Sequence, residues 1–253
     1  MDTSPLEPGA DRVEQTVLFT GAGGRIGKHI LAPLKARYRT VRAFDRQPIP
    51  GEPDTLVGEL EDAAALRAAM EGVDTLLHFA AQADEAPFIE QLVGPNVIGC
   101  YNAFQIAQEC GVKRIVFAST VQTVGAYPQE YTIQIADPPR PVSLYGATKV
   151  FGEVMGRWYY DHHGIEFVGL RIGGFQPYDS PGLRKYGGLR NIWLSPRDCA
   201  TLVMRAIEAP DVGYALVFGT SRTPFERLSL TPARELLGYE PQDSIADLDE
   251  QNP

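Results

Sequence analysis

The sequence predicts an α/β protein with a Rossmann-like, doubly wound parallel sheet and a small C-terminal substrate lobe. One observation is a glycine-rich stretch, Thr20–Gly27, that stands between a short apolar run and a segment with apolar residues at helical spacing. Another is the alternation of strand-like apolar runs with helical patterns up to residue 170, which is typical of a parallel sheet covered on both faces. The length of 253 residues is enough to bury a substantial core.

Strands and helices are expected in alternation along the first two thirds of the chain. Runs of β-formers predict strands at 16–20, 40–44, 55–58, 75–79, 114–118 and 166–170. Helical spacing predicts helices at about 25–38, 62–71, 86–110 (interrupted at Gly94–Pro95) and 143–163. Beyond these, a helix at about 197–208, a strand at about 214–218 and a short helix at 232–237 are expected. The expected divisions are a flexible tail (1–14), a dinucleotide-binding domain (15–170) and a substrate-binding lobe with the C-terminal tail (171–253).

The glycine-rich turn has the context of a dinucleotide-binding site. Gly21 permits the tight turn, Gly24 lets the backbone approach a pyrophosphate, and Gly27 lets the helix pack close to the strand. The helix that follows presents N–H groups and the positive end of its dipole to the phosphates. An ordinary strand-to-helix turn is the alternative, but the flanking strand and helix favour the nucleotide site.

Asp45 indicates which dinucleotide is expected. It lies at the C-terminal end of the second strand, where a carboxylate accepts hydrogen bonds from ribose hydroxyl groups and repels a 2′-phosphate. This favours NAD over NADP. Arginine accommodates a 2′-phosphate, but we interpret Arg46 and Arg25 as solvent-exposed. The adenine is expected beside Glu59 and Leu60, which follow the third strand.

Tyr145 and Lys149 are the strongest candidates for chemistry. They lie four residues apart at the start of a predicted helix, so they share one face. Tyrosine has a pKa near ~10 and is a weak base at neutral pH. A lysine ammonium beside it favours the phenolate and lowers that pKa, and the positive nicotinamide ring of NAD⁺ lowers it further. The pair is therefore expected to act as a tuned general base.

A hydroxyl group is needed to hold the substrate oxygen. Ser119 and Thr120 end the fifth strand, at the carboxyl edge where ligands bind in parallel sheets. Thr120 is the better candidate, and the alternative is that both residues only cap the loop. Two charged residues are interpreted as structural: Glu153 as a pair with Lys149 on the helix, and Asp198 as a helix cap.

The ordered motifs resemble those of the extended short-chain dehydrogenase/reductase family. Thr20–Gly27 resembles its TGxxGxxG turn, His78–Ala81 its HxAA segment, and Asn96–Gly99 its central-helix asparagine motif. The tyrosine, lysine and threonine described above match its catalytic positions. The resemblance covers nearly the whole chain. It implies a Rossmann fold, bound NAD and hydride transfer at a sugar-like carbinol.

The resemblance implies that cofactor contacts come from most loops at the carboxyl edge. The residues expected to bind NAD are Gly21, Gly24, Arg25, Ile26, Gly27, Asp45, Glu59, Leu60, Phe79, Ala80, Ala81, Asn96, Ser119, Tyr145, Lys149 and Ile172. In the implied reaction Tyr145 removes the hydroxyl proton, Thr120 hydrogen-bonds the same oxygen, and Lys149 contacts the nicotinamide ribose.

Several segments are similar to those of uronate dehydrogenases, which oxidise C1 of a hexuronate to an aldarolactone. These segments are 116–119, 124–128, 144–153 and 171–173. The sequence departs from those enzymes at pocket positions, where Ala83 and Gly174 replace serines, Gln122 replaces a histidine and Val121 an asparagine. The expected substrate residues are Ala83, Thr120, Gln122, Tyr145, Gly174, Arg184 and Arg190.

The two arginines belong to a positive cluster, Arg184, Lys185 and Arg190, in an otherwise acidic chain. The cluster follows the sixth strand and is expected over the carboxyl edge. An arginine fork binds a carboxylate through two parallel hydrogen bonds, and uronate dehydrogenases use an arginine of this loop for the sugar acid. We expect one of the two arginines to bind a substrate carboxylate; the alternative is a solvated basic loop.

Composition excludes several classes of partner. The formal net charge of −9 argues against nucleic acid and anionic membranes, and no apolar run approaches the ~20 residues of a membrane helix. The N-terminus lacks the pattern of a signal peptide. The three cysteines show no metal-site spacing, so reduced cysteines, no metal and a cytoplasmic location are expected.

The sequence favours an NAD-dependent dehydrogenase of a small free sugar or sugar acid. The first alternative is a nucleotide-sugar epimerase or dehydratase, for which the 104 residues after Lys149 leave little room. The second is a non-catalytic NAD-sensing protein, which would not need the three catalytic side chains. The helices around 86–110 and 143–163 resemble those through which the family dimerises, so a homodimer or higher homo-oligomer is expected.

Overall fold

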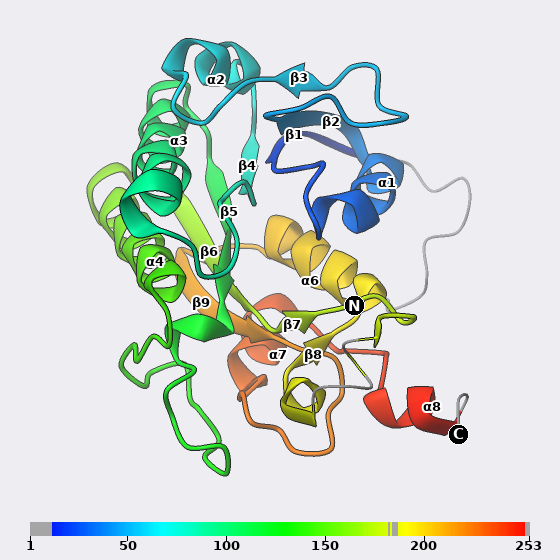
Figure 1. The fold of residues 1–253 in the computed structure, drawn as a ribbon. Helices are drawn as coiled ribbons and strands as arrows, with labels where there is room; N and C mark the ends of the chain where they lie inside the picture. Colours follow the sequence, from blue (N-terminus) through cyan, green and yellow to red (C-terminus); the bar gives the residue numbers. More distant parts are fainter. Residues whose placement is uncertain (1–11, 182, 184–186, 251–253) are drawn as a thin grey trace.

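A seven-stranded parallel sheet forms the centre of the molecule (Figure 1). The computed structural model describes residues 12–181, 183 and 187–250. The strands are β1 (Val13–Thr20), β2 (Tyr38–Asp45), β3 (Leu56–Val57), β4 (Thr75–His78), β5 (Arg114–Thr120), β6 (Glu166–Ile172) and β9 (Tyr214–Gly219). They lie in the order β3-β2-β1-β4-β5-β6-β9, so the chain runs outward from β1 and then crosses to β4 on its other side. This confirms the predicted doubly wound arrangement, with one further strand.

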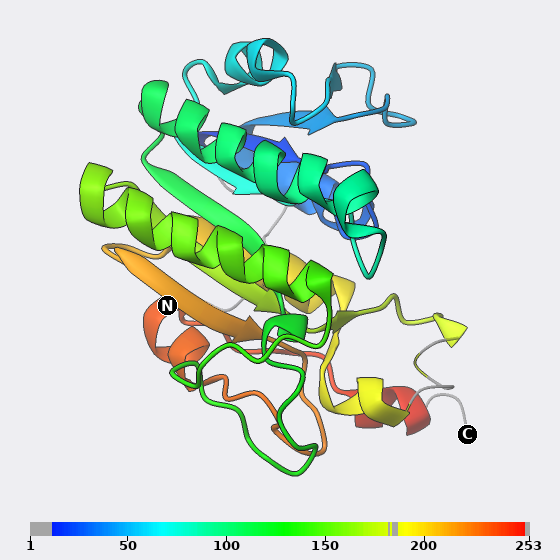
Figure 2. The ribbon, with the colours of Figure 1, turned by 60° about the vertical axis from the view of Figure 1, so that its left-hand side comes forward.

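Helices cover both faces of this sheet (Figure 2). The helices and helical turns are α1 (Gly27–Arg37), α2 (Ala63–Met70), η1 (Phe88–Ile98), α3 (Gly99–Glu109), η2 (Val121–Thr123), α4 (Leu144–His163), η3 (Gly187–Asn191), α6 (Pro196–Glu208), α7 (Thr231–Leu237) and α8 (Ile245–Glu250). Helices α2, α3 and α4 pack on one face, and α1, α6 and α7 on the other. In the described part of the chain, no helix combines the length and the hydropathy that a membrane span requires.

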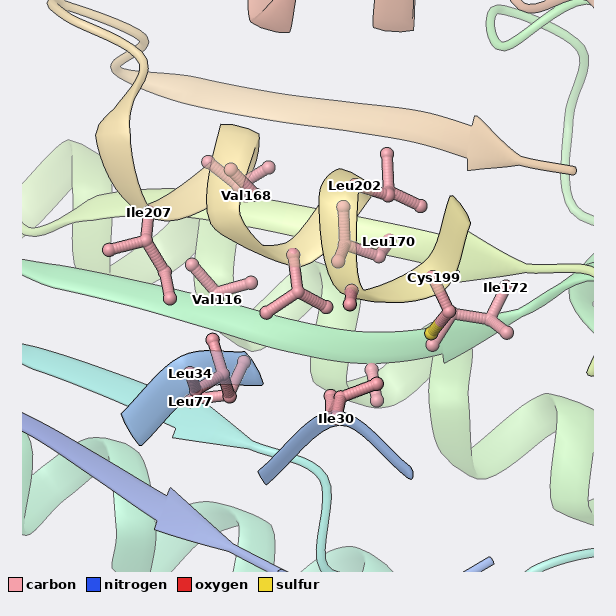
Figure 3. Packing of buried hydrophobic residues seen from close by; sticks show 14 of the residues in the cluster. Ile30, Leu34, Leu77, Val116, Val168, Leu170, Ile172, Cys199, Leu202 and Ile207 are labelled. Atoms are coloured by element: carbon pink, nitrogen blue, oxygen red, sulfur yellow. The ribbon is translucent and has the colours of Figure 1, made fainter. Parts of the chain in front are cut away.

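The central strands β4 and β5 are buried on both faces, as expected for a parallel sheet between two layers of helices. All seven residues of β5 are buried. Figure 3 shows Ile30 and Leu34 of α1 and Leu202 and Ile207 of α6 on the same face of the sheet as Val116 and Val168. Each such side chain contributes about 1.5–3 kcal/mol by its removal from water. The paired layers hold the strand ends, and the loops that follow them, in fixed positions.

Strands β5 and β6 run two residues further than the sequence predicts. Ser119 and Thr120, expected at the very end of the fifth strand, pair with Arg171 and Ile172 in parallel register. The ladder between the two strands therefore continues up to the carboxyl edge. It places Thr120 and Ile172 side by side at the end of the sheet.

The helical region 86–110 is continuous, although an interruption was expected at Gly94–Pro95. Segment η1 has the wider π-helical winding and runs directly into α3. Pro95 lacks the N–H that an α-helix uses in its i→i−4 bond, and a π-helical turn accommodates such a break in the bonding pattern. Gly94–Pro95 therefore does not end the helix; it lies in a π-helical stretch that continues into the α-helix α3.

The segment after residue 170 does not form one separate lobe, which corrects the expected boundary between 15–170 and 171–253. Strand β9 pairs with β6 in the main sheet, and α6 packs on a face of that sheet. The small sheet of β7 (Gly174–Phe175) and β8 (Trp193–Leu194) follows the end of β6. At the other terminus β1 begins at Val13, inside the stretch 1–14 expected to be a tail; residues 1–11 lie outside the described ranges.

Asp198 is not a helix cap, which corrects its sequence-based interpretation. Ser195 caps α6, because its Oγ accepts the Asp198 N–H at 3.0 Å. The buried Asp198 carboxylate accepts hydrogen bonds from Ser221 Oγ at 2.7 Å and from the N–H groups of Gln242 and Asp243 at 2.8 and 3.0 Å. Asp198 therefore connects the C-terminal segment, at Gln242 and Asp243, to the start of α6 by hydrogen bonds.

Candidate active site

A cavity of about 980 Å³ lies at the carboxyl edge of the sheet. Its wall comes from the loops after β1, β2, β3, β4, β5 and β6 and from the first turns of α4. Ligands of doubly wound sheets bind at this edge, where the strand order reverses, here between β1 and β4. The predicted site residues in the wall are Gly21, Gly24, Arg25, Ile26, Gly27, Asp45, Glu59, Leu60, Phe79, Ala80, Ala81, Ala83, Ser119, Thr120, Gln122, Tyr145, Lys149, Ile172 and Gly174.

The glycine-rich turn lets a ligand approach its backbone closely. Gly21 has a φ of +75°, and a Cβ on it would lie 2.6 Å from the backbone nitrogen of Ala80. A Cβ on Gly27 would lie 2.4 Å from the carbonyl oxygen of Ala22, so only glycine lets α1 begin this close to the turn. The first N–H groups of a helix have no partner within it and bind phosphate groups well. The turn therefore fits the diphosphate of a dinucleotide.

Asp45 lies in the same wall at the end of β2, with Arg46 beside it. Its Oδ2 accepts the Gly23 N–H at 2.9 Å, which holds the carboxylate against the glycine-rich turn. A carboxylate has further acceptor positions, so Asp45 can also accept ribose hydroxyl groups. Arg25 is directed to the other side of β1, where its Nη1 lies 3.3 Å from Asp84 Oδ2 in the loop after β4. This arrangement fits the predicted NAD site.

Tyr145 and Lys149 both line the cavity from α4. The Lys149 Nζ lies 5.7 Å from the centre of the Tyr145 ring and 4.8 Å from that of Phe117. Burial lowers the pKa of Lys149 to about 8, so the lysine stays largely charged at neutral pH. The pair is thus brought together as predicted.

The pKa of Tyr145 differs from the sequence-based expectation. Burial raises this pKa above its ordinary value; the negative charge of Asp84 raises it further, and the positive charge of Arg25 opposes the shift. The expected lowering of this pKa is therefore wrong for the protein alone, because desolvation of the phenolate is the largest influence on it. A tyrosine base at this position needs an additional positive charge close to it.

Thr120 is the hydroxyl residue in position to contact a substrate. Its Oγ1 accepts the Gln122 N–H at 3.2 Å, so it caps η2, and the Thr120 O–H stays available to donate to a ligand. The Ser119 Oγ donates instead to the buried Glu153 Oε1 at 2.5 Å. Consecutive residues of a strand point to opposite faces, which explains the difference. Thr120 therefore caps the loop, as one of the two alternatives has it, and its hydroxyl proton is left for a ligand in the cavity.

Gln122 is oriented by the residue that caps α4. The Ser143 Oγ accepts the Gly146 N–H at 2.9 Å and donates to Gln122 Oε1 at 2.6 Å. Since the amide oxygen is engaged, the amide NH₂ group is what Gln122 offers to a ligand. The loop after β5 is thereby connected to the helix that carries Tyr145.

Glu153 pairs with Arg171 and not with Lys149, which corrects its expected role. The Arg171 Nε and Nη2 donate to Glu153 Oε1 and Oε2 at 2.9 and 2.8 Å, and the two side chains are 2% and 3% exposed. Because Ser119 donates to the same carboxylate, the pair connects α4, β5 and β6.

Asn96, expected to bind the cofactor, is not part of the cavity wall. Its Oδ1 accepts the Gln82 N–H at 2.8 Å, and its Nδ2 donates to the Gln82 carbonyl and to Thr148 Oγ1, both at 3.0 Å. All of its polar atoms are used to hold the loop after β4 against α4. Asn96 therefore acts on the site through the residues that it positions.

Glycine and apolar residues, together with Gln176, form the end of the cavity beyond β6. A Cβ on Gly174 would lie 2.7 Å from Leu189 Cδ2, so a serine there requires Leu189 to move. Arg184 lies outside the described residues. Arg190 follows Leu189 in η3 but is not in the wall itself. The sequence analysis missed wall residues that belong to no motif, among them Gln82, Asp84, Gln176, Leu189 and Ile192.

The fold and the site together define a Rossmann-type dinucleotide-binding protein with a Tyr/Lys/Thr constellation at one end of its cofactor cleft. The chain belongs to the NAD dependent epimerase/dehydratase family, whose model matches residues 17–175. It is 37% identical to the NAD-dependent glucose-6-phosphate dehydrogenase of Haloferax volcanii, over 93% of this chain and 96% of that enzyme.

Other relatives also match the chain over most of its length. The chain is 36% identical to the uronate dehydrogenase of Pseudomonas putida, over 90% of this chain and 84% of that enzyme. It is 32% identical to the L-arabinose 1-dehydrogenase (NAD(P)(+)) of Haloferax volcanii, over 91% of this chain and 97% of that enzyme. The solved structure of a variant uronate dehydrogenase from Agrobacterium tumefaciens, complexed with NAD, superimposes with a TM-score of 0.85 at 30% identity, over 94% of this chain and 89% of that chain.

Proposed function

We propose that this protein is an NAD-dependent dehydrogenase that oxidises the C1 hydroxyl group of a small free sugar or sugar acid to a lactone. The observation that carries the proposal is the placement of Tyr145, Lys149 and Thr120 in one cavity with the glycine-rich turn and Asp45. The relatives that the chain covers over most of their length are dehydrogenases of sugars and uronates, and the name of one specifies position 1.

NAD fits the residues of the cleft, and when bound it supplies the hydride acceptor and a positive charge that lowers the pKa of Tyr145. The glycine-rich turn holds the diphosphate, and Asp45 accepts hydrogen bonds from the ribose. Tyr145 removes the proton of the sugar hydroxyl group, while Thr120 donates a hydrogen bond to the same oxygen. Lys149 keeps a positive charge beside the phenolate.

Within this proposal, a substrate carboxylate would be bound by Arg184 or Arg190. Changing the arginine concerned to alanine is expected to raise KM for the acid at least about tenfold, since a charge-assisted contact contributes roughly 1.5–3 kcal/mol. Affinity for NAD should not change. If both single variants keep their KM, or if the enzyme prefers the neutral sugar to the matching uronate, this part of the proposal is wrong.

A screen of NAD⁺ reduction over free aldoses, uronates and aldose phosphates tests the proposed reaction. Matched sets such as glucose, glucuronate and glucose 6-phosphate separate the class of sugar from its charge. The methyl glycoside of each active sugar is the control, because its C1 oxygen carries no proton. Oxidation of the glycoside at the same rate would refute C1 as the reacting position.

The proposal includes a cytoplasmic protein that self-associates through α3 and α4. The outer faces of these helices expose Tyr101, Val154 and Trp158. Sedimentation of the wild type should give at least a dimer, and a Trp158→Glu variant should shift it toward the monomer.

A further inference from the structure

The Arg25–Asp84 ion pair connects the two functional ends of the cavity. Arg25 belongs to the glycine-rich turn, and Asp84 belongs to the loop between β4 and η1. Their side chains are 56% and 58% exposed, and the two charged atoms are 3.3 Å apart. Exposed pairs of this kind are weak and exchange partners readily. Both residues line the cavity, so a ligand there meets both charges.

The loop around Asp84 is fixed on both sides. Asn96 binds the backbone N–H and carbonyl groups of Gln82, and Glu85 Oε2 accepts the Leu144 N–H at 3.0 Å, at the start of α4. Asp84 itself has a φ of +64°, a left-handed conformation that aspartate and asparagine tolerate better than most residues. The carboxylate is therefore held beside the N-terminus of the helix that carries Tyr145.

The charge of Asp84 acts on Tyr145, at the end of the cavity where the proposed reaction takes place. It raises the pKa of Tyr145, and Arg25 lowers it. A carboxylate is an acceptor-only group and suits a ligand that presents several hydroxyl donors. A guanidinium binds phosphate oxygens through paired, charge-assisted hydrogen bonds, which are stronger than an exposed pair with a carboxylate.

We propose that Asp84 binds the hydroxyl groups of the sugar, and that Arg25 holds this carboxylate in the free protein and exchanges it for the diphosphate of the cofactor. The sugar-binding part of the proposal rests on the proposed function. The diphosphate competes with Asp84 for Arg25 and so favours the released carboxylate, which means that a filled cofactor site favours the complete sugar site. Since binding couplings are reciprocal, Asp84 opposes cofactor binding in the free protein.

Fluorescence titration with NADH tests the exchange without any substrate. Asp84→Asn and Asp84→Gly both remove the charge and both tolerate the left-handed backbone, so neither should disturb the fold. We expect each variant to bind NADH about two- to fivefold more tightly, and Arg25→Gln to bind it more weakly. In the Arg25→Gln background, Asp84→Asn should have no further effect. Unchanged or weaker NADH binding by both Asp84 variants overturns the exchange.

Steady-state kinetics at saturating NAD⁺ test the sugar contact. Both Asp84 variants should raise KM for the sugar about tenfold or more and change kcat only a few-fold; a merely structural role would weaken NADH binding as well. Glu14→Gln, which breaks the exposed Arg39–Glu14 pair far from the cavity, is the matched control and should change neither quantity. An unchanged KM overturns Asp84 as a sugar ligand. A wild type that oxidises no sugar overturns the proposed function together with the sugar contact, whereas the NADH titration still decides the exchange.

Discussion

Glu153→Gln should destabilise this protein more than any charge-neutralising change at its surface. The Glu153 carboxylate accepts two hydrogen bonds from Arg171 and one from Ser119, and both charged side chains are at most 3% exposed. Glutamine keeps the shape but leaves a guanidinium charge buried without a counterion, and arginine cannot lose its proton. Breaking a buried pair in this way costs about 3–5 kcal/mol. That is a large fraction of a typical domain stability of about 5–15 kcal/mol.

Urea and thermal unfolding followed by circular dichroism measure this effect. For a chain of this size, the cost corresponds to a fall in Tm of about 6–20 °C. Asp161→Asn is the control, because it breaks the exposed Arg157–Asp161 pair on the same helix and should have a small effect. A Glu153→Gln variant that is as stable as Asp161→Asn would show that the charge of Arg171 does not depend on Glu153.

Three further predictions concern the cofactor and the catalytic residues. Lys149 has a pKa of about 8, so its positive charge is present below that pH. Lys149→Met should therefore lower kcat at pH 7 and move the rising limb of the pH–rate profile to higher pH. An unmoved limb would contradict an electrostatic role of Lys149. Asp45→Ala should narrow the preference for NAD⁺ over NADP⁺ in kcat/KM, and a wild type that already prefers NADP⁺ would contradict the role of Asp45. Thr120→Val should lower kcat/KM about 10- to 100-fold without weakening NADH binding, as expected for the loss of one hydrogen bond to a reacting oxygen.

The part of the fold that follows from local patterning was predictable. Apolar runs alternating with helical periodicity predicted the order of strands and helices, and the glycine-rich turn predicted which sheet edge carries the site. The sequence assigned the strand at about 214–218 to the C-terminal lobe, because a short apolar run does not reveal its partner. Its pairing with β6 depends on the packing of α6 across the face of the sheet.

The meeting of Tyr145, Lys149 and Thr120 in one cavity was predictable, because Tyr145 and Lys149 have helical spacing and Thr120 ends a strand. The roles of Asn96 and Glu153 were not, because each depends on a partner distant in sequence. Asn96 uses its amide on Gln82 and Thr148, and Glu153 uses its carboxylate on Arg171. The pKa of Tyr145 was also out of reach, since desolvation is a property of the folded site.

The transfer of deuterium from C1 of the sugar tests the central claim most directly. The wild type is incubated with NAD⁺ and an active aldose or uronate labelled with deuterium at C1, and the reduced cofactor is analysed by mass spectrometry and NMR. We predict that the label appears in the reduced nicotinamide ring, and that Tyr145→Phe slows its appearance by a factor of about 10²–10⁴ while NADH still binds. Reduced cofactor without the label, or label transfer by Tyr145→Phe at nearly the wild-type rate, would contradict the account.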